Sequence, residues 1–409
     1  MRRAEDFSVV NRWFLFGVLM TPYIFYAFLF NTEVFLRPYI AESLGLSKTQ
    51  VAAFYTAQAI GAIIGSIVLS QLADRTSRRN TYAAIAVLLG IAALSITFVD
   101  SYQLALLHRF AMGFFLGGMF GCAVSLYMGL FPPYQTGLLA GLVQLVYNGG
   151  DAILSWTGRH FDAESWRTVI EIGGVGAITT GVAVFLFLPG DKSYSTWGGA
   201  SDGRAIETRF VQLAELFHSG RWRLTLRLVL LCGLNFLGFQ SFNAWTTTYL
   251  REDQAYSPDL VGKLLTILHI GSMLGALFWG WVADTAGRRA NAIGFLICAV
   301  SIVFYLTLAP SPMTFAIVGF VFGVGLVSSG IWGPYFAELY PVHLRATAAS
   351  IFNWGRIFSL FGALLTGLMA DTIGLRWTMM SGSLIFLLGA VIWWTLPETL
   401  NRPSNPVNS

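Results

Sequence analysis

Residues 61–79 read GAIIGSIVLSQLADRTSRR, and residues 271–289 read GSMLGALFWGWVADTAGRR. Two glycines, an Ala-Asp pair and a closing Arg-Arg coincide in the two copies at one constant offset of 210 positions (271 minus 61). Each copy ends an apolar run and enters a charged loop. A chain that repeats such a unit after half its length is predicted to form two parallel bundles of six helices each.

The composition places these bundles in a membrane. Of the 409 residues, 55% are hydrophobic and 11% are charged, whereas a soluble domain carries about 25% charged residues. These values exclude a disordered chain, a coiled coil and an ordinary cytosolic enzyme. The net charge of +4 does not indicate nucleic-acid binding, because the basic residues lie between apolar runs instead of on one face.

Twelve apolar runs are each long enough to cross a bilayer as a helix. They cover residues 14–36, 50–72, 80–99, 103–130, 135–158, 167–188, 223–249, 259–283, 290–309, 312–336, 346–370 and 376–396. The expected fold is therefore an all-α membrane protein with twelve transmembrane helices in two pseudo-symmetric bundles. The first run is too long for the core of a signal peptide and is expected to remain as a span.

The two bundles are expected at residues 1–188 and 223–409, joined by a polar linker at 189–222. Within the linker, apolar residues recur every three or four positions, which predicts a short amphipathic helix on the membrane surface: Ile206, Phe210, Leu213 and Phe217. Cys122, Cys232 and Cys298 all fall in apolar runs without metal or redox spacing, so we interpret them as packing residues. No cofactor or metal is predicted.

The basic residues predict the orientation. If the N-terminus is cytoplasmic, sixteen of the 25 Lys and Arg residues face the cytoplasm and seven face outward, Arg37 among the seven. The remaining two, Arg109 and Arg356, lie inside spans. This excess follows the positive-inside rule and predicts cytoplasmic termini, in the inner membrane of a bacterium.

Several motifs resemble those of the major facilitator superfamily. The signature loop after the second helix appears as Ala73-Asp74-Arg75 and Arg78-Arg79, and again as Ala283-Asp284 and Gly287-Arg288-Arg289. Further matches are Arg109-x-x-x-Gly113-x-x-x-Gly117, Ala337-Glu338-Leu339-Tyr340-Pro341 with Arg345, Asn353-Trp354-Gly355-Arg356-Ile357, and Pro397-Glu398-Thr399. The last three look most like the branches of aromatic-acid or metabolite proton symporters and sugar porters.

The sequence also departs from the family pattern. The first signature loop begins with Ser70 and has Ser77 where glycine is usual, and the loop after the fourth helix lacks the Glu and Arg that Glu338 and Arg345 supply in the second half. The fifth helix reads Tyr147-Asn148-Gly149-Gly150-Asp151 and lacks the Gly-Pro motif of drug antiporters. This difference argues against a drug exporter.

Ionisable side chains inside a bilayer are costly and are functional candidates by default. Glu33, late in the first helix, and Arg109, early in the fourth, are expected at similar depth. The resemblance implies that Glu33 accepts the proton with Arg109 as its partner, and Asp151 is a possible partner of Arg109 or a second proton carrier. The alternative is a static buried ion pair.

Arg356 and His269 are expected near the membrane midplane in the second half. An arginine fork binds a carboxylate through two hydrogen bonds, so the pair predicts a site for an organic anion. The alternatives are an arginine that braces helices and a satisfied core histidine.

Further candidates for binding the substrate are polar or aromatic residues on helix faces: Gln144, Asn148, Gln240, Asn243, Asn353, Tyr26 and Trp332. Asn243 lies at Glu33 plus the repeat offset and is its uncharged counterpart. Polar residues also join helices to each other, and aromatics often only pack, so both interpretations stay open.

The charged loops predict a gate on the cytoplasmic side, formed by Asp74, Arg78, Arg79, Asp284, Arg288, Arg289, Glu338 and Arg345. Such charges can pair in one state of a two-state transporter and separate in the other.

The leading hypothesis is a monomeric symporter that imports a small organic anion, an aromatic or hydroxy monocarboxylate, together with protons. The second hypothesis keeps the fold and makes the substrate a neutral sugar or polyol. A membrane enzyme is disfavoured because the sequence has no metal-protease, nucleophile-elbow or phosphate-loop motif. A sensor is disfavoured because the linker leaves no room for a signalling domain.

Overall fold

The computed structural model describes residues 7–131, 136–190, 221–340 and 351–400, together with Phe217 and Ala348. Within these ranges the chain is helical and contains no β-strand. The elements are, in chain order, α1 (Val9–Leu44), α2 (Lys48–Arg75), α3 (Arg78–Leu94), η2 (Ser95–Phe98), α4 (Tyr102–Met128), α5 (Thr136–Gly158), α6 (Trp166–Phe187), α8 (Trp222–Ser241), η6 (Asn243–Trp245), α9 (Thr246–Thr248), η7 (Tyr249–Asp253), α10 (Pro258–Thr285), η8 (Arg288–Asn291), α11 (Ala292–Thr307), α12 (Pro312–Leu326), η9 (Val327–Ile331), α13 (Trp332–Glu338), α15 (Ile351–Trp354), α16 (Arg356–Thr372) and α17 (Leu375–Trp394).

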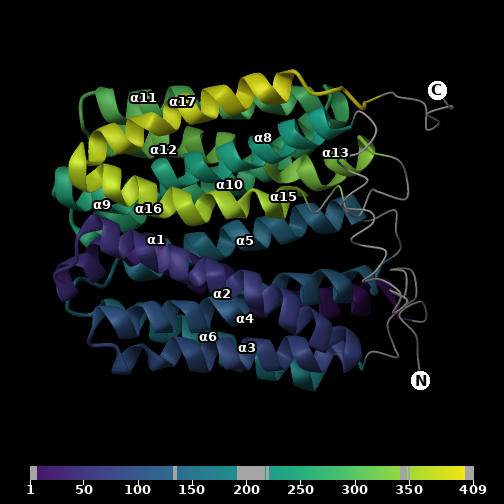
Figure 1. Cartoon of the computed structure of the whole chain (residues 1–409). Coiled ribbons are helices and arrows are strands. Elements are labelled where there is room, and N and C mark those ends of the chain that lie inside the picture. Colours follow the sequence, from purple (N-terminus) through teal and green to yellow (C-terminus); the bar gives the residue numbers. More distant parts are fainter. Residues whose placement is uncertain are drawn as a thin grey trace.

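The helices match the predicted membrane spans. Ten of them, among the described residues, are long and apolar enough to cross a bilayer. The segments α5 and α15–α16 lie alongside these ten (Figure 1) and correspond to the fifth and eleventh predicted spans. The predicted amphipathic helix of the linker falls almost entirely outside the described residues.

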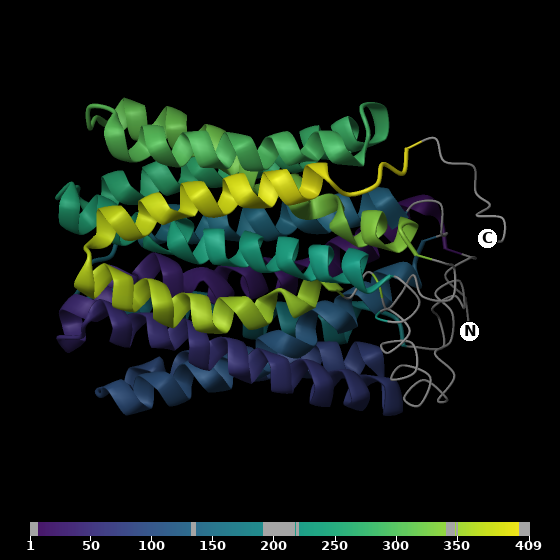
Figure 2. The same cartoon turned by 45° about the horizontal axis from the view of Figure 1, so that its top comes forward.

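The helices form two bundles that lie side by side (Figures 1 and 2). In the first, α2 packs on α4, α3 packs on α6, and α1 contacts α5 and α6. In the second, α10 packs on α12, α11 on α17, and α8 on α16 and α17. Across the boundary, α5 contacts α10 and α2 contacts α16.

The repeated glycines bring helices into close contact within each bundle. A side chain at Gly61 or Gly65 would collide with the backbone of α4 at Phe110 and Phe114. At the equivalent positions in the second bundle, Gly271 and Gly275 face the α12 backbone in the same way. Small residues let two helix backbones approach closely in a membrane, which explains why both copies carry the glycine pair.

The loops gather at two ends of the molecule. We call the end where α1 begins and α17 ends the terminal end, and it also holds the loops at 76–77 and 286–287. The opposite end, the distal end, holds the loops at 45–47, 159–165, 254–257 and 373–374.

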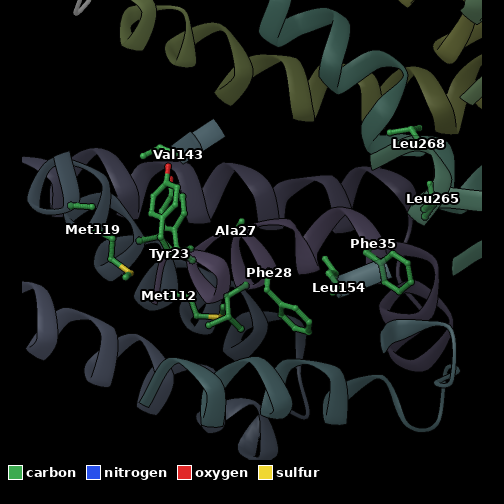
Figure 3. Close-up of a cluster of buried hydrophobic side chains, with 14 of the residues drawn as sticks. Tyr23, Ala27, Phe28, Phe35, Met112, Met119, Val143, Leu154, Leu265 and Leu268 are labelled. Carbon is green, nitrogen blue, oxygen red and sulfur yellow. The ribbon is translucent and has the colours of Figure 1, made fainter. Parts of the chain in front are cut away.

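Helix α1 lies in the middle of the first bundle, next to the boundary with the second. Figure 3 shows its buried side chains facing α4 and α5, with two α10 residues nearby. The labelled members of this core are Tyr23, Ala27, Phe28, Phe35, Met112, Met119, Val143, Leu154, Leu265 and Leu268. This position brings the polar residues of α1 close to both bundles.

The seventh span is interrupted. Helix α8 ends at Ser241, and the chain continues through the 3-10 turn η6 and the π-helical turn η7 before α10 begins. Breaks of this kind inside transporter helices often line a binding site. The interruption lies between Gln240 and Asn243, two of the predicted substrate-binding residues.

Candidate functional site

Asp151 of α5 is a buried carboxylate at the boundary between the bundles. Its Oδ1 accepts a hydrogen bond of 2.5 Å from Asn31 of α1, and the same amide nitrogen donates to the hydroxyl of Tyr147 at 3.1 Å. Its Oδ2 lies 4.0 Å from Nδ1 of His269, which belongs to α10 of the second bundle. The prediction that Asp151 could pair with Arg109 is therefore replaced by these two contacts.

Arg356 begins α16 on the opposite side of the boundary. Its guanidinium lies between two aromatic rings, 5.9 Å from the centre of Phe30 in the first bundle and 5.7 Å from that of Phe236 in the second. The Tyr26 hydroxyl lies beside it. Its Nε is buried and has no hydrogen-bond partner among the described residues.

Aromatic residues surround this cation on the side of the first bundle. Tyr23 and Tyr26 stack at 4.9 Å, and Tyr147 lies 6.0 Å from Tyr26. Phe30 meets Tyr55 edge to face at 6.3 Å. Flat apolar faces carrying hydroxyl groups next to a cation suit an aromatic ring that bears a carboxylate.

The structure corrects the predicted partner of Glu33. Glu33 is fully buried, and its Oε1 accepts hydrogen bonds from Arg37, one helical turn further along α1, at 2.8 and 3.1 Å. Arg37 was expected in an outward-facing loop, but α1 continues to Leu44 and buries it. The Arg37 guanidinium also lies 4.4 Å from the ring centre of Trp245 in the second bundle.

Arg109 lies close to the predicted depth but bonds to a neighbour of Glu33. Its Nη1 donates to the hydroxyl of Thr32 at 2.9 Å, and its Nη2 is buried without a partner in the described part of the chain. Glu33 and Arg109 belong to α1 and α4 of the same bundle, so movement between the bundles would leave their separation unchanged.

The polar candidates on α5 and α8 differ in their surroundings. Asn148 is buried and donates to the backbone oxygen of Gln144, one turn earlier, at 2.8 Å. Gln240 is fully buried, and neither atom of its amide has a hydrogen-bond partner within the described ranges. Asn243 is buried in the turn η6, at the break of the seventh span.

Trp332 lies away from the boundary between the bundles. Its ring stacks on Phe336 at 5.6 Å and meets Phe295 and Trp393 edge to face. These contacts place it in the aromatic core of the second bundle. The side chain of Asn353 lies outside the described residues.

The loop that carries Arg288 is held by charges from its own bundle. Arg288 contacts Asp284 at 2.7 Å and Glu338 at 3.0 Å. Glu398, just beyond α17, accepts from the backbone N–H groups of Arg288 and Arg289, both at 2.9 Å. Arg289 donates to the backbone oxygen of Leu396. The expected contact of Glu338 with this loop is therefore present, and it joins elements of one bundle only.

The Glu398 carboxylate, part of the Pro397-Glu398-Thr399 motif, joins the end of α17 to the loop that carries Arg288. Partial burial acts to raise the pKa of its carboxyl, but backbone N–H bonds from Leu400, Arg289, Arg288 and Thr399 outweigh burial and lower the pKa below its usual range. Gly287 has φ of 102°, and a Cβ there would strike the Glu398 carboxylate. A glycine is required at this turn.

The first signature loop is only partly described. Arg79 donates to the backbone oxygens of Phe185 and Leu188 at the end of α6, at 3.3 and 3.0 Å. Arg78 is half-buried at the start of α3. The side chain of Asp74 and the whole of Arg345 lie outside the described residues.

The distal end is closed by polar contacts that were not predicted from the sequence. Asp371 of α16 accepts from the backbone N–H groups of Lys48 and Thr49 and from the Thr49 hydroxyl, at 3.1, 2.9 and 2.7 Å. Lys48 also lies 3.1 Å from Glu252.

A third contact lies at the same end, where Arg159, just beyond α5, is 3.7 Å from Asp259 of α10. Each of these contacts links the first bundle to the second. A hollow of about 350 Å³ opens beside them, lined by Pro38, Ala41, Glu42, Leu46, Arg251 and Glu252. It lies at the distal surface and does not include the Arg356 cluster.

No group of three or more His, Cys, Asp or Glu side chains that could hold a metal occurs in the described part of the chain. Cys122, Cys232 and Cys298 are buried. What the structure does gather is a cation, a carboxylate and an imidazole among aromatic rings, between two bundles of membrane-length helices. A fold and site of this kind define a membrane transporter for small molecules.

The comparison with known families agrees. The model of the Major Facilitator Superfamily matches residues 13–356 and 228–409, and the chain belongs to this family.

Curated relatives and a solved structure cover nearly the whole chain. The 4-hydroxybenzoate transporter of Acinetobacter baylyi is 24% identical and aligns over 81% of its own length and 84% of this chain. A purine ribonucleoside efflux pump of Shigella sonnei is 26% identical and covers 86% of both chains. The crystal structure of a D-xylose-proton symporter superimposes with a TM-score of 0.74 at 14% identity, covering 96% of this chain and 99% of that one.

Proposed function

We propose that this protein is a proton-coupled symporter that imports a small aromatic or hydroxy monocarboxylate by alternating access. It acts as a monomer in the inner membrane of a bacterium, with both termini in the cytoplasm. The observation that carries the proposal is Arg356, a half-buried cation between aromatic rings at the boundary of the two bundles, whose buried Nε has no hydrogen-bond partner among the described residues.

The charge of Arg356 favours an anionic substrate. A cation withdrawn from water is costly unless an opposite charge compensates it, and no carboxylate among the described residues forms an ion pair with Arg356. A substrate carboxylate would supply that charge through two parallel hydrogen bonds. The rings of Tyr26, Phe30 and Phe236 would then face the rest of the molecule.

The relatives support this substrate class. 4-Hydroxybenzoate, named for one relative, is an aromatic ring with a carboxylate and a hydroxyl. A purine ribonucleoside, named for another, also contains a flat ring system, and that relative is an efflux pump. Because one of these relatives is an efflux pump, the relatives alone do not favour import. The proposal that this chain imports its substrate is based on proton coupling.

Proton coupling follows from the charge of the substrate. Moving an anion into a negatively charged cell interior costs about 2.3 kcal/mol for each 100 mV, and a proton carried in the same cycle cancels that charge. The side chains proposed for the proton are Glu33, with Arg109 close to it, and Asp151. The contacts at the distal end support an outward-closed state, in which the site would open toward the terminal end.

A neutral sugar or polyol is the second candidate. It is favoured by Gln240, whose amide has two unpartnered atoms within the described ranges and could bind hydroxyl groups. Asn148 and Asn243 would contribute in the same way, and Arg356 would then only brace the helices.

The experiment measures binding to the purified protein by thermal shift, since a ligand that binds the folded state raises the melting temperature. 4-Hydroxybenzoate, a series of other monocarboxylates and a series of sugars are compared. For wild-type protein we expect a shift with a carboxylate, and Arg356→Gln should weaken binding at least about tenfold because a hydrogen bond to a charged group is worth ~1.5–3 kcal/mol.

Arg227→Gln, which removes an exposed arginine of α8, is the matched control and should bind as wild type does. Arg356→Lys separates the need for charge from the need for a fork. Shifts with sugars alone, unaffected by Arg356→Gln, would reject the carboxylate in favour of the second candidate.

A further inference from the structure

We infer that Asp151 and His269 form the proton-coupling pair of this transporter, with Asp151 as the carrier and His269 as the group that senses the state of the bundles. The inference rests on the proposed function, in which transport is coupled to protons. Of Glu33, Arg109 and Asp151, it assigns the proton to Asp151. It also gives His269 a role in coupling instead of the predicted role in substrate binding.

The first step of the argument is position. Asp151 lies on α5 and His269 on α10, and these two helices pack against each other across the boundary between the bundles. The 4.0 Å separation between Oδ2 of Asp151 and Nδ1 of His269 is therefore a distance between the two bundles. It must change if the bundles rock, as alternating access requires.

Glu33 lacks this property. Its hydrogen-bonded partner Arg37 lies four residues further along the same helix, and both are fully buried. A helix-internal pair keeps its separation when the helix moves as a unit. The Glu33–Arg37 separation is therefore fixed within α1, and only the cation–π contact of Arg37 with Trp245 crosses to the second bundle.

The second step concerns the packing on either side of the pair. One turn beyond Asp151, toward the distal end, the backbone of Ser155 lies so close to Gly262 of α10 that a Cβ there would meet its oxygen at 2.5 Å. Arg159 follows with its contact to Asp259. The pair thus lies in the interface between α5 and α10, with the Ser155–Gly262 and Arg159–Asp259 contacts between it and the distal end.

The third step is the surroundings of the carboxylate. Asn31 from α1 binds Oδ1, and Tyr147 from α5 shares the same amide. Tyr26 of α1 also lies within electrostatic range, and His269 faces Asp151 from α10. Among these titratable neighbours only His269 becomes positively charged, and it comes from the other bundle.

The coupling then follows from electrostatics. In one state Asp151 meets Asn31 and the imidazole in a dry contact, and in the other the separated helices let water reach it. The free energy of the charged carboxylate therefore differs between the two states. A proton therefore binds to Oδ2 from water on one side, forming one O–H bond, and leaves to water on the other side when the contact changes.

The test uses protein reconstituted in liposomes, with uphill uptake of 4-hydroxybenzoate driven by an inward proton gradient and counterflow exchange measured without one. Asp151→Asn should lose uphill accumulation at least tenfold while keeping counterflow. Asp151→Glu, which retains a carboxyl group, should restore part of the accumulation. His269→Gln should shift the pH dependence of uptake. Glu164→Gln, in the exposed loop after α5, is the matched control.

The overturning result is specific. If Asp151→Asn accumulates substrate as wild type does, Asp151 is not the carrier and the inference is wrong, although the proposed function survives. If no carboxylate is transported at all, the proposed function has failed. A substrate-free measurement then decides: an infrared pH-difference spectrum should show a protonated carboxyl band that disappears in Asp151→Asn and moves in His269→Gln, and a band unchanged in both variants rejects the inference.

Discussion

Asp371 of the second bundle caps a helix of the first: its carboxylate accepts hydrogen bonds from the backbone N–H groups of Lys48 and Thr49, in the first turn of α2. The first N–H groups of a helix have no partner inside the helix and favour a negative charge. Ser47 supplies the usual cap within the chain. Asp371 therefore adds a second cap that exists only while the distal end is closed.

Replacing Asp371 should make the distal end open more often. A helix cap contributes about 1 kcal/mol, so Asp371→Asn should increase the open population roughly fivefold. The measurement is the labelling rate of Ala52→Cys by a membrane-impermeant thiol reagent, since Ala52 is fully buried next to Gly367 of α16. Thr372→Ala at the end of the same helix is the control, and equal labelling in Asp371→Asn and Thr372→Ala would contradict a capping role in closure.

Breaking the Glu33–Arg37 pair should destabilise the protein. Glu33→Gln leaves a buried arginine without its counter-charge, which in buried pairs costs ~3–5 kcal/mol. Thermal melts in detergent should show a lower melting temperature for Glu33→Gln and for Arg37→Gln, with strongly non-additive effects in the double variant. A larger coupling between Glu33 and Arg109 than between Glu33 and Arg37 would restore the pairing expected from the sequence.

The Glu398 carboxylate should make stability depend on acid pH. Because its pKa in the folded protein lies below the ordinary value, its contribution to stability is fully present above the unfolded pKa and is lost as the pH falls through the folded pKa. The melting temperature of wild-type protein should therefore fall below about pH 5 more steeply than that of Glu398→Gln. Parallel curves for the two proteins would show that Glu398 does not hold the loop.

Two glycines of α10 offer a matched pair of substitutions in one helix, and only Gly275 belongs to the repeat. A Cβ at Gly275 would collide with the backbone of Val324 in α12, whereas nothing lies near Gly280. Gly275→Ala should lower thermal stability by ~1–3 kcal/mol through overpacking, and Gly280→Ala should be neutral or slightly stabilising because alanine favours the helix. Equal melting temperatures would show that α10 and α12 separate easily.

The repeated stretch and the apolar runs were enough to predict the bundles. Their helices appear at the expected places because length and hydropathy are local properties of the sequence. The predicted end of the first helix was wrong. A proline such as Pro38 often ends a helix, yet α1 continues through Pro38 to Leu44. That error placed Arg37 in a loop and hid the partner of Glu33.

The central site could be predicted only in part. Asp151, His269 and Arg356 stood out because ionisable groups are rare inside spans. Their partners did not, because Asn31 and Phe236 look like ordinary residues of an apolar run. Asp371 was missed altogether, since a cap supplied by another helix leaves no trace in the spacing of the sequence.

The charged loop around Arg288 also determines how the second bundle can deform. Arg288, Asp284, Glu338 and Glu398 tie the ends of α10, α13 and α17 to one another. These contacts resist sliding of the three helices past one another. The second bundle is therefore expected to tilt as a rigid body, so that a rotation at the terminal end also displaces the distal end. Any bending in the proposed cycle would then fall on the interrupted seventh span and on α1, the two segments that border the proposed substrate site.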